Sequence, residues 1–308
     1  LLLDKDPPAA RLHLDRALRL APDDAESLQT LAHACAAAGE HLRAVRALDR
    51  LRALRQAAGD REAAARLALQ AGGLWERELG HPENALLRYR EAAELGPSAA
   101  EAHRLAAACA ERLGRWAEAA DHHAAALADL DRRGPAARAE AAAHHLALAD
   151  VAERRLDDPA GAATHLEAAL ADAPPDAARL GRLAALYRRL GRPAELVAAL
   201  DRLAPLAATP EARAGLLAEA GDLCRGPLGR PDAAQARFAA ALAHHPACRP
   251  ALDGLAAVAA LRGDAPAERE ALTRLLPMAA GPAEEAVLLD RLASACERAG
   301  DLAGAARA

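Results

Sequence analysis

The sequence has very few aromatic side chains, no isoleucine at all, and a single Asn, Lys, Met and Phe. Aromatic residues make up 2% of the 308 residues, whereas the hydrophobic types together make up 53%. Any core must therefore be built mainly from Ala and Leu, and both residues favour the helix strongly. The composition predicts an all-α protein.

Several functional classes are disfavoured by what is missing. The five cysteines are far apart, odd in number and without a CxxC pair, so a disulfide framework or a zinc knuckle is not expected. No apolar run reaches the roughly 18 residues that a membrane-spanning helix requires. HExxH, a phosphate-binding glycine loop and GxSxG are all absent, and we expect neither an enzyme nor a cofactor.

The charge balance of the sequence indicates which classes of partner to expect. A formal net charge of -5 leaves no excess of basic residues for a face that engages phosphates. An RNA-binding helical repeat is the alternative to consider, but it needs a basic groove with a regular code position. We therefore expect a protein or peptide partner, with neither nucleic acid nor membrane among the ligands.

One stretch of the sequence recurs. LGHPENALLRYREAAELGP, Leu79–Pro97, aligns without a gap with Leu156–Pro174 and Leu228–Pro246, and a fainter copy occupies Asp4–Pro22. The closing prolines are 75, 77 and 72 residues apart (97 - 22, 174 - 97 and 246 - 174). Each interval is about twice the length of one helical hairpin, so it should contain two.

Each copy predicts one helix with a mixed small and large face. An early Pro fits the first helical turn, and the closing Pro pushes the residue before it out of the helical conformation. Spacings of four and three residues place an Ala, a bulkier residue and a second Ala on one side of the helix. These triplets are Ala85, Tyr89 and Ala92; Ala162, Leu166 and Ala169; and Ala234, Phe238 and Ala241.

A second helix pair fills each interval, which gives roughly sixteen helices in antiparallel pairs. Gly39, Gly114, Gly191 and Gly263 stand where a left-handed residue would close a helix. Longer connections are expected once in each double-hairpin unit, near Gly59, Gly134-Pro135, Thr209-Pro210 and Gly281-Pro282.

In this frame the sequence resembles the tetratricopeptide repeat (TPR) family, whose motif is W-x2-L-G-x2-Y followed by Ala, Phe, Ala and Pro. The resemblance implies a right-handed α-solenoid of helix hairpins, continuous over residues 1–308. It also implies that the first helices of the pairs line a concave groove for partner peptides or helices. In Ala177–Leu203 the motif positions are held by Leu180, Leu183, Ala184, Tyr187 and the turn residue Gly191.

Carried over by this frame, the resemblance places a set of charged residues in the groove. Arg182, Arg188 and Arg189 lie within two turns, and we expect them to bind a partner carboxylate or phosphate. The alternative is a solvated face of Glu–Arg pairs. Gln29, His33 and Gln70 occupy the slots of a Lys and Asn clamp that some family members have. The full set is Arg104, Glu111, Arg112, Asp150, Glu153, Arg154, Arg182, Arg188, Arg189 and Arg225.

Two histidine doublets are equally distant from the turn at Arg133-Gly134. In an antiparallel hairpin, His122-His123 and His144-His145 would meet at one level. His123 and His145 take inward-facing motif positions, where they could pair, hold a divalent metal or respond to pH. Successive helical residues point about 100° apart, so four ligands do not converge easily, and packed or solvent-facing imidazoles are the alternative.

Three cysteines share the aromatic position of the first helix. Cys35, Cys224 and Cys296 occupy the slot that Trp75 and Tyr187 fill in other units. A buried Cys behaves as a small hydrophobic residue, so we interpret all three as core residues rather than reactive thiols.

The expected function is a protein–protein interaction scaffold that binds a partner segment in the groove. The alternative is a regulatory arm of a larger signalling enzyme or transcription regulator. The sequence starts at LLLDKDPP and stops within a helix at DLAGAARA, so the native protein is expected to continue in both directions. Unpaired thiols make the cytoplasm the default compartment.

Overall fold

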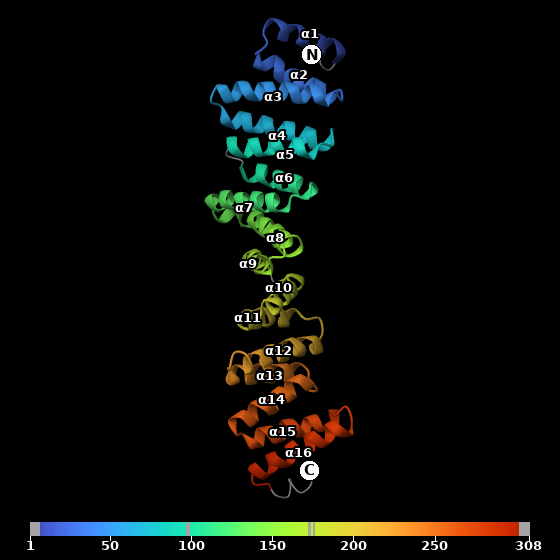
Figure 1. The fold of residues 1–308 in the computed structure, drawn as a ribbon, viewed down its shortest axis with the longest axis vertical. Helices are drawn as coiled ribbons and strands as arrows, with labels where there is room; N and C mark the ends of the chain where they lie inside the picture. The colour runs from blue at the N-terminus through green and yellow to red at the C-terminus, as the bar shows by residue number, and fades with distance from the viewer. Residues whose placement is uncertain (1–6, 97–98, 172–173, 175, 302–308) are drawn as a thin grey trace. The chain divides into compact units, whose positions relative to one another are not determined.

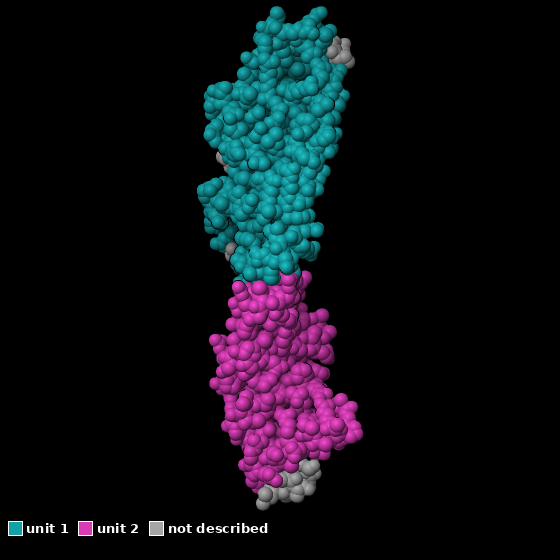
Figure 2. Space-filling model, in the orientation of Figure 1, with its two compact units in different colours: residues 1–172 teal, residues 173–308 magenta. Residues whose placement is uncertain are grey.

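The computed structural model describes residues 7–96, 99–171, 174 and 176–301. Over these residues the protein contains sixteen α-helices, three short 3-10 helices and no strand, which confirms the all-α prediction (Figure 1). The chain divides into two compact units, residues 1–172 and 173–308 (Figure 2).

Unit 1 is a succession of helices in which each packs chiefly against its neighbours in sequence. Local packing of this kind is typical of a solenoid, whose repeats contact only the next repeat. Its helices are α1 (Pro7–Leu20), α2 (Ala25–Ala37), α3 (His41–Ala57), α4 (Arg61–Arg77), α5 (Pro82–Leu95), α6 (Ala99–Arg112), α7 (Trp116–Arg133), α8 (Arg138–Arg154) and α9 (Pro159–Ala171).

Unit 2 repeats this plan, and in addition α12 contacts α14 directly. The even-numbered helices are the first helices of the pairs, and the odd-numbered helices are the second. The helices of unit 2 are α10 (Ala177–Leu190), α11 (Pro193–Leu203), α12 (Pro210–Arg225), α13 (Pro231–His244), α14 (Arg249–Arg262), α15 (Ala265–Leu275) and α16 (Pro282–Arg298).

Helix ends follow the turn residues of the sequence. Pro82, Pro159 and Pro231 are the first residues of α5, α9 and α13, as predicted. The α9 and α13 helices end before Pro174 and Pro246, whereas Pro97 lies outside the described residues. Side-chain oxygens of Asp24, Asp60, Asp176, Thr209 and Asp264 accept hydrogen bonds from backbone N–H groups three residues later, which caps five further helices.

The glycine turns have the expected left-handed backbone. The φ values of Gly39, Gly114, Gly191 and Gly263 lie between 63° and 76°. Among the described non-glycine residues only Asp157 has positive φ, at 48°, and it stands where Gly occurs in the two other long repeat copies. The 3-10 helices Pro135–Ala137, Ala204–Leu206 and Leu276–Met278 form three of the four longer connections that the repeat predicts.

The mixed small and large faces form the core. All nine residues of the three predicted triplets are buried. The Phe238 ring of α13 lies between two helix backbones, because a Cβ built on Gly221 of α12 would come within 2.5 Å of the ring and one on Gly254 of α14 within 2.2 Å. Gly72 of α4 has the same relation to Tyr89 of α5, at 2.5 Å. Gly72, Gly221 and Gly254 therefore stand where an aromatic ring leaves no room for a Cβ.

The five cysteines are free and buried. Burial raises the pKa of the Cys35 thiol, and it raises the pKa of Cys109 to about 11. A thiol with a raised pKa is a poor nucleophile and a poor metal ligand. The interpretation of Cys35, Cys224 and Cys296 as core residues is confirmed by their exposed fractions of 0%, 2% and 3%.

Candidate partner-binding surfaces and histidine pairs

The predicted groove residues of unit 1 lie on two first helices, α6 and α8. Arg104 is exposed, and Asp150 is half-buried. Glu111 contacts His123 Nε2 through its Oε1 atom at 3.2 Å, and Arg112 donates to Oε1 of Glu76 at 3.0 Å. Glu111 and Arg112 therefore make contacts within the protein, whereas Arg154 is exposed at the end of α8.

The three arginines of α10 do not form one set of equivalent anchors. The guanidinium of Arg188 donates to both carboxylate oxygens of Glu219 on α12, at 2.6 and 2.7 Å. This bidentate pair raises the pKa of Arg188. Arg188 therefore forms a Glu–Arg pair within the protein, which is the arrangement that the sequence analysis gave as the alternative to partner binding. Arg182 is half-buried and Arg189 is exposed, and their role as anchors stays a prediction.

A groove of about 450 Å³ runs along the first helices of unit 2. Arg225 of α12, Arg249 of α14 and Arg291 of α16 all line it. Arg225 donates to Asp222 at 3.0 Å, and Arg249 forms ion pairs with Asp253 and Glu284. Among the described residues Arg291 has no such carboxylate partner. The lining is completed by Asp222, Pro250, Asp253, Gly254 and Ala257.

Unit 1 has a corresponding groove of about 400 Å³ between α2 and α4. The residues that stand at the clamp slots, Gln29, His33 and Gln70, all line it, together with Arg77. The three side chains at these slots therefore line one groove. The amides of Gln29 and Gln70 provide hydrogen bonds, whereas Arg77 carries the positive charge that a terminal carboxylate needs.

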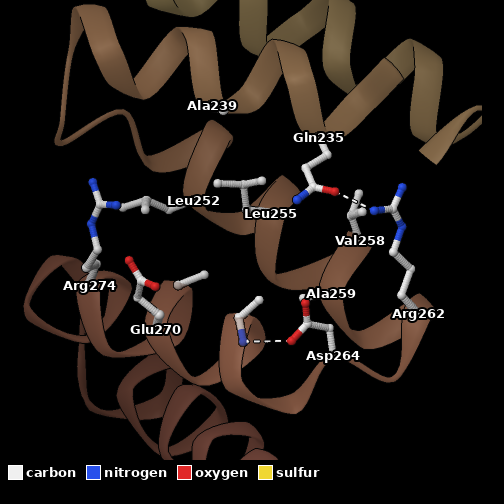
Figure 3. A pocket seen from close by; sticks show the side chains of 12 residues that line it. Gln235, Ala239, Leu252, Leu255, Val258, Ala259, Arg262, Asp264, Glu270 and Arg274 are labelled. Carbon is white, nitrogen blue, oxygen red and sulfur yellow. Dashed lines mark hydrogen bonds between the residues drawn. The ribbon is translucent and has the colours of Figure 1, made fainter. Parts of the chain in front are cut away.

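A third hollow, which the sequence analysis missed, lies among α13, α14 and α15 (Figure 3). It measures about 190 Å³ and has an apolar lining that includes Leu252, Leu255 and Val258. Arg262 and Gln235 are hydrogen-bonded at one end, while Arg274 and Glu270 lie toward the other. The motif frame directs attention to the first helices, whereas two of the three helices that form this hollow, α13 and α15, are second helices.

The histidine doublets meet in the α7–α8 hairpin, as their equal distance from the turn predicted, but the partners differ from the expected ones. The Nδ1 atom of His123 lies 2.9 Å from Nδ1 of His144. His145 instead faces His165 of α9, with an Nδ1–Nδ1 distance of 3.2 Å. The pairing of His123 with His145 was therefore wrong, because the rotation of α8 turns His144 toward α7.

A third pair lies one helix earlier, where Nδ1 of His103 on α6 is 3.1 Å from Nδ1 of His122 on α7. His103 and His165 were missed by the sequence analysis, although each lies opposite its partner across a turn. In the described part of the chain, no group of three or more His, Cys, Asp or Glu side chains is placed to hold a metal ion. A metal held by His123 and His145 would need them to face each other, which they do not.

None of the described helices combines the length and apolarity that a bilayer crossing needs. No known protein family matches the sequence, and neither does any curated protein. Structure comparison finds MamA at 18% identity, covering 56% of this chain and 88% of that chain, with a TM-score of 0.40. YrrB, described as a TPR protein with an unusual peptide-binding site, has 21% identity, coverage of 61% and 90%, and a TM-score of 0.37.

A third similar structure is the Naa15/Naa10 assembly bound to HypK-THB, at 15% identity with a TM-score of 0.46. That match covers 96% of this chain but 44% of the other chain. At identities this low the similarity concerns the fold alone.

The repeat itself identifies the fold. Consecutive helices form hairpins closed by left-handed glycines, and the small and large residues at the motif positions are buried between them. Leu180, Leu183, Ala184 and Tyr187 of α10 are all at most 3% exposed, as the motif frame requires. Each of the two units is a TPR-like helical solenoid.

Proposed function

We propose that the protein is a protein–protein interaction scaffold, and that the groove along α12, α14 and α16 binds an acidic segment of a partner. The observation that carries this proposal is Arg291, which lines the groove half-buried and without a carboxylate partner among the described residues. The other two groove arginines are already paired with carboxylates. A guanidinium without a carboxylate partner is suited to a partner carboxylate, which it can bind through two parallel hydrogen bonds.

The groove also suits an extended segment. The small residues Gly254 and Ala257 of α14 line the groove between the charged side chains. The first helices are held by their neighbours before a partner arrives, so little conformational entropy is lost on the receptor side. Arg225 and Arg249 can exchange their intramolecular pairs for a second partner carboxylate, which would give salt-dependent binding.

The test uses fluorescein-labelled ten-residue peptides in two matched libraries, one rich in Asp and Glu and the other with Asn and Gln in their places. Fluorescence polarisation with the full chain should detect binding of the acidic library alone. Arg291→Ala should weaken that binding about tenfold, which corresponds to about 1.4 kcal/mol.

The matched control is Arg274→Ala, which removes a cation from the hollow among α13, α14 and α15. This variant should bind the acidic library as the unmodified chain does. Equal binding of both libraries would contradict the proposal. A loss of binding in Arg274→Ala but not in Arg291→Ala would place the partner in the other hollow.

A further inference from the structure

Three imidazole pairs connect four consecutive helices of unit 1. His103 and His122 join α6 to α7, His123 and His144 join α7 to α8, and His145 and His165 join α8 to α9. The ring centroids of the pairs are 5.1 to 5.4 Å apart. These six residues, which we name the histidine seam, are half of the twelve histidines in the sequence.

Each Nδ1–Nδ1 contact requires that one of its two Nδ1 atoms carries no proton. A hydrogen bond between two imidazole nitrogens needs one N–H donor and one bare nitrogen as acceptor. If both Nδ1 atoms carried protons, two N–H groups would face each other at about 3 Å. Uptake of a proton by the accepting ring therefore breaks the contact.

The central pair is the most constrained, because His123 is 6% exposed and His144 is 2% exposed. The Nε2 atom of His123 is 3.2 Å from Oε1 of Glu111, to which it donates its proton. That tautomer leaves Nδ1 of His123 as the acceptor and makes His144 the donor. Nε2 of His144 is buried without a hydrogen-bond partner in the described structure, so a proton added there would create a buried, unpaired charge.

The surroundings reinforce this preference for neutral rings. Burial is the main cause that lowers the pKa values of His103, His122, His145 and His165, and it lowers the pKa of His144 to about 4. The neighbouring cations act in the same direction, namely Arg104 on His144 and Arg90 on His122. Carboxylates partly oppose the effect of burial on these pKa values. They are Asp129 at His103, Glu118 and Asp121 at His122, Asp131 at His145 and Asp158 at His165. Glu111 faces His123.

We propose that the histidine seam is an acid-sensitive set of contacts. It stabilises the packing of α6 to α9 near neutral pH, and its contacts break when the imidazoles take up protons. The packed helix pairs of this segment are also joined by Ala-rich contacts, which bury little apolar area per residue. The seam supplies polar contacts at each of the three helix interfaces, so its loss affects the whole segment rather than one hairpin.

The sign of the pH dependence follows from linkage. A histidine whose folded pKa lies below its unfolded value binds fewer protons when folded, so stability falls as the pH drops below the unfolded pKa. The stabilisation is fully present above about pH 6.5 and is lost progressively toward pH 4. For His144 alone, pKa values of about 4 folded and 6.5 unfolded increase the unfolding equilibrium constant about 30-fold at pH 5.

The experiment measures urea unfolding of the full chain at several pH values between 7.5 and 4.5. Both tryptophans, Trp75 and Trp116, belong to unit 1, and Trp116 of α7 lies against Arg155 at 4.3 Å. Tryptophan fluorescence therefore reports on the unit that contains the seam. The test variant combines His122→Asn, His144→Asn and His165→Asn, because an Asn amide can still donate or accept but does not titrate.

The matched control replaces three exposed histidines outside the seam, in His13→Asn, His33→Asn and His244→Asn. Between pH 7.5 and 5, the unfolding constant of the unmodified chain and of the control should rise at least about 30-fold more than that of the test variant. Parallel pH curves for the unmodified chain and the test variant would overturn the proposal.

If the test variant does not fold, NMR titration of the histidine Cε1 protons in the unmodified chain decides the question. The imidazoles of His103, His122, His144, His145 and His165 should titrate below the ordinary histidine pKa of about 6.5, and chemical shifts of α6 to α9 should change with them. Titration of all twelve histidines together, near pH 6.5, would refute the proposal that the contacts of the seam are acid-sensitive.

Discussion

Ala in place of Gly221 should destabilise unit 2, whereas Ala in place of Gly215, in the same helix α12, should stabilise it. Both positions are helical, so both substitutions gain about 0.5 to 1 kcal/mol from the lower conformational entropy of the unfolded chain. At Gly215 no heavy atom lies within 4 Å of the added Cβ. The helical gain should therefore be the whole effect at that position.

At Gly221 the added Cβ would lie 2.5 Å from Cε1 and 2.7 Å from Cδ1 of Phe238. Carbon atoms in contact are usually about 3.5 to 4.0 Å apart, so the overlap exceeds about 1 Å. The ring has no room to move away, because it is 0% exposed and Gly254 holds its other side. Overpacking of this kind costs about 1 to 3 kcal/mol, which exceeds the helical gain.

Urea unfolding followed by far-ultraviolet circular dichroism measures both variants, and tryptophan fluorescence, which reports unit 1, serves as an internal reference. Gly221→Ala with Phe238→Leu should be more stable than the sum of the two single effects predicts, by about 1 kcal/mol or more. Unit 1 already has this combination, since Ala149 and Leu166 stand at the same repeat positions. A Gly221→Ala variant as stable as Gly215→Ala, or strictly additive effects, would refute the reasoning.

Two further substitutions test other features of the fold. Arg298→Ala should destabilise unit 2 by about 1.5 to 3 kcal/mol, because Glu268 is 3% exposed and its Oε2 atom accepts a hydrogen bond from Arg298 at 2.6 Å. The double variant Arg298→Ala with Glu268→Ala should recover part of this loss in the same urea assay. Gly229→Ala should lower the free energy of unfolding by about 1 to 2 kcal/mol, because the φ of Gly229 is 60°. Asp157→Gly, at the corresponding turn, should not lower it. Thermal unfolding measures both variants, and a Gly229→Ala variant as stable as the unmodified chain would contradict this account.

The helices were predictable because the signals that start and end them are local. Pro at a first turn and Gly at a left-handed turn act within one or two residues, and the repeat shows them several times. The relation between glycine and aromatic residue was also present in the sequence, since Tyr89 follows Gly72, and Phe238 follows Gly221, by 17 residues (89 - 72 and 238 - 221). The repeat pattern relates positions within one helix, whereas this signal joins two helices.

Ion pairs between helices were harder to predict than the helices. Arg188 and Glu219 are 31 residues apart. Helix α10 also carries Arg182 and Arg189, and α12 also carries Glu211 and Asp222. Which of them pair depends on the rotation of α10 and α12 about their axes, and no spacing rule contains that angle. An arginine at the same motif position can therefore either face a partner or form an ion pair within the protein.

The histidines show how one angle decides a site. Equal distances from a turn place two doublets at the same level of a hairpin, and they leave open which member of each doublet faces across. Because adjacent residues on a helix point about 100° apart, the pairing of His123 with His144 turns His122 and His145 outward. Each outward ring then meets the helix on the other side, where His103 and His165 stand. The geometry that prevents four imidazoles from converging on one metal is therefore the geometry that extends the contacts through four helices.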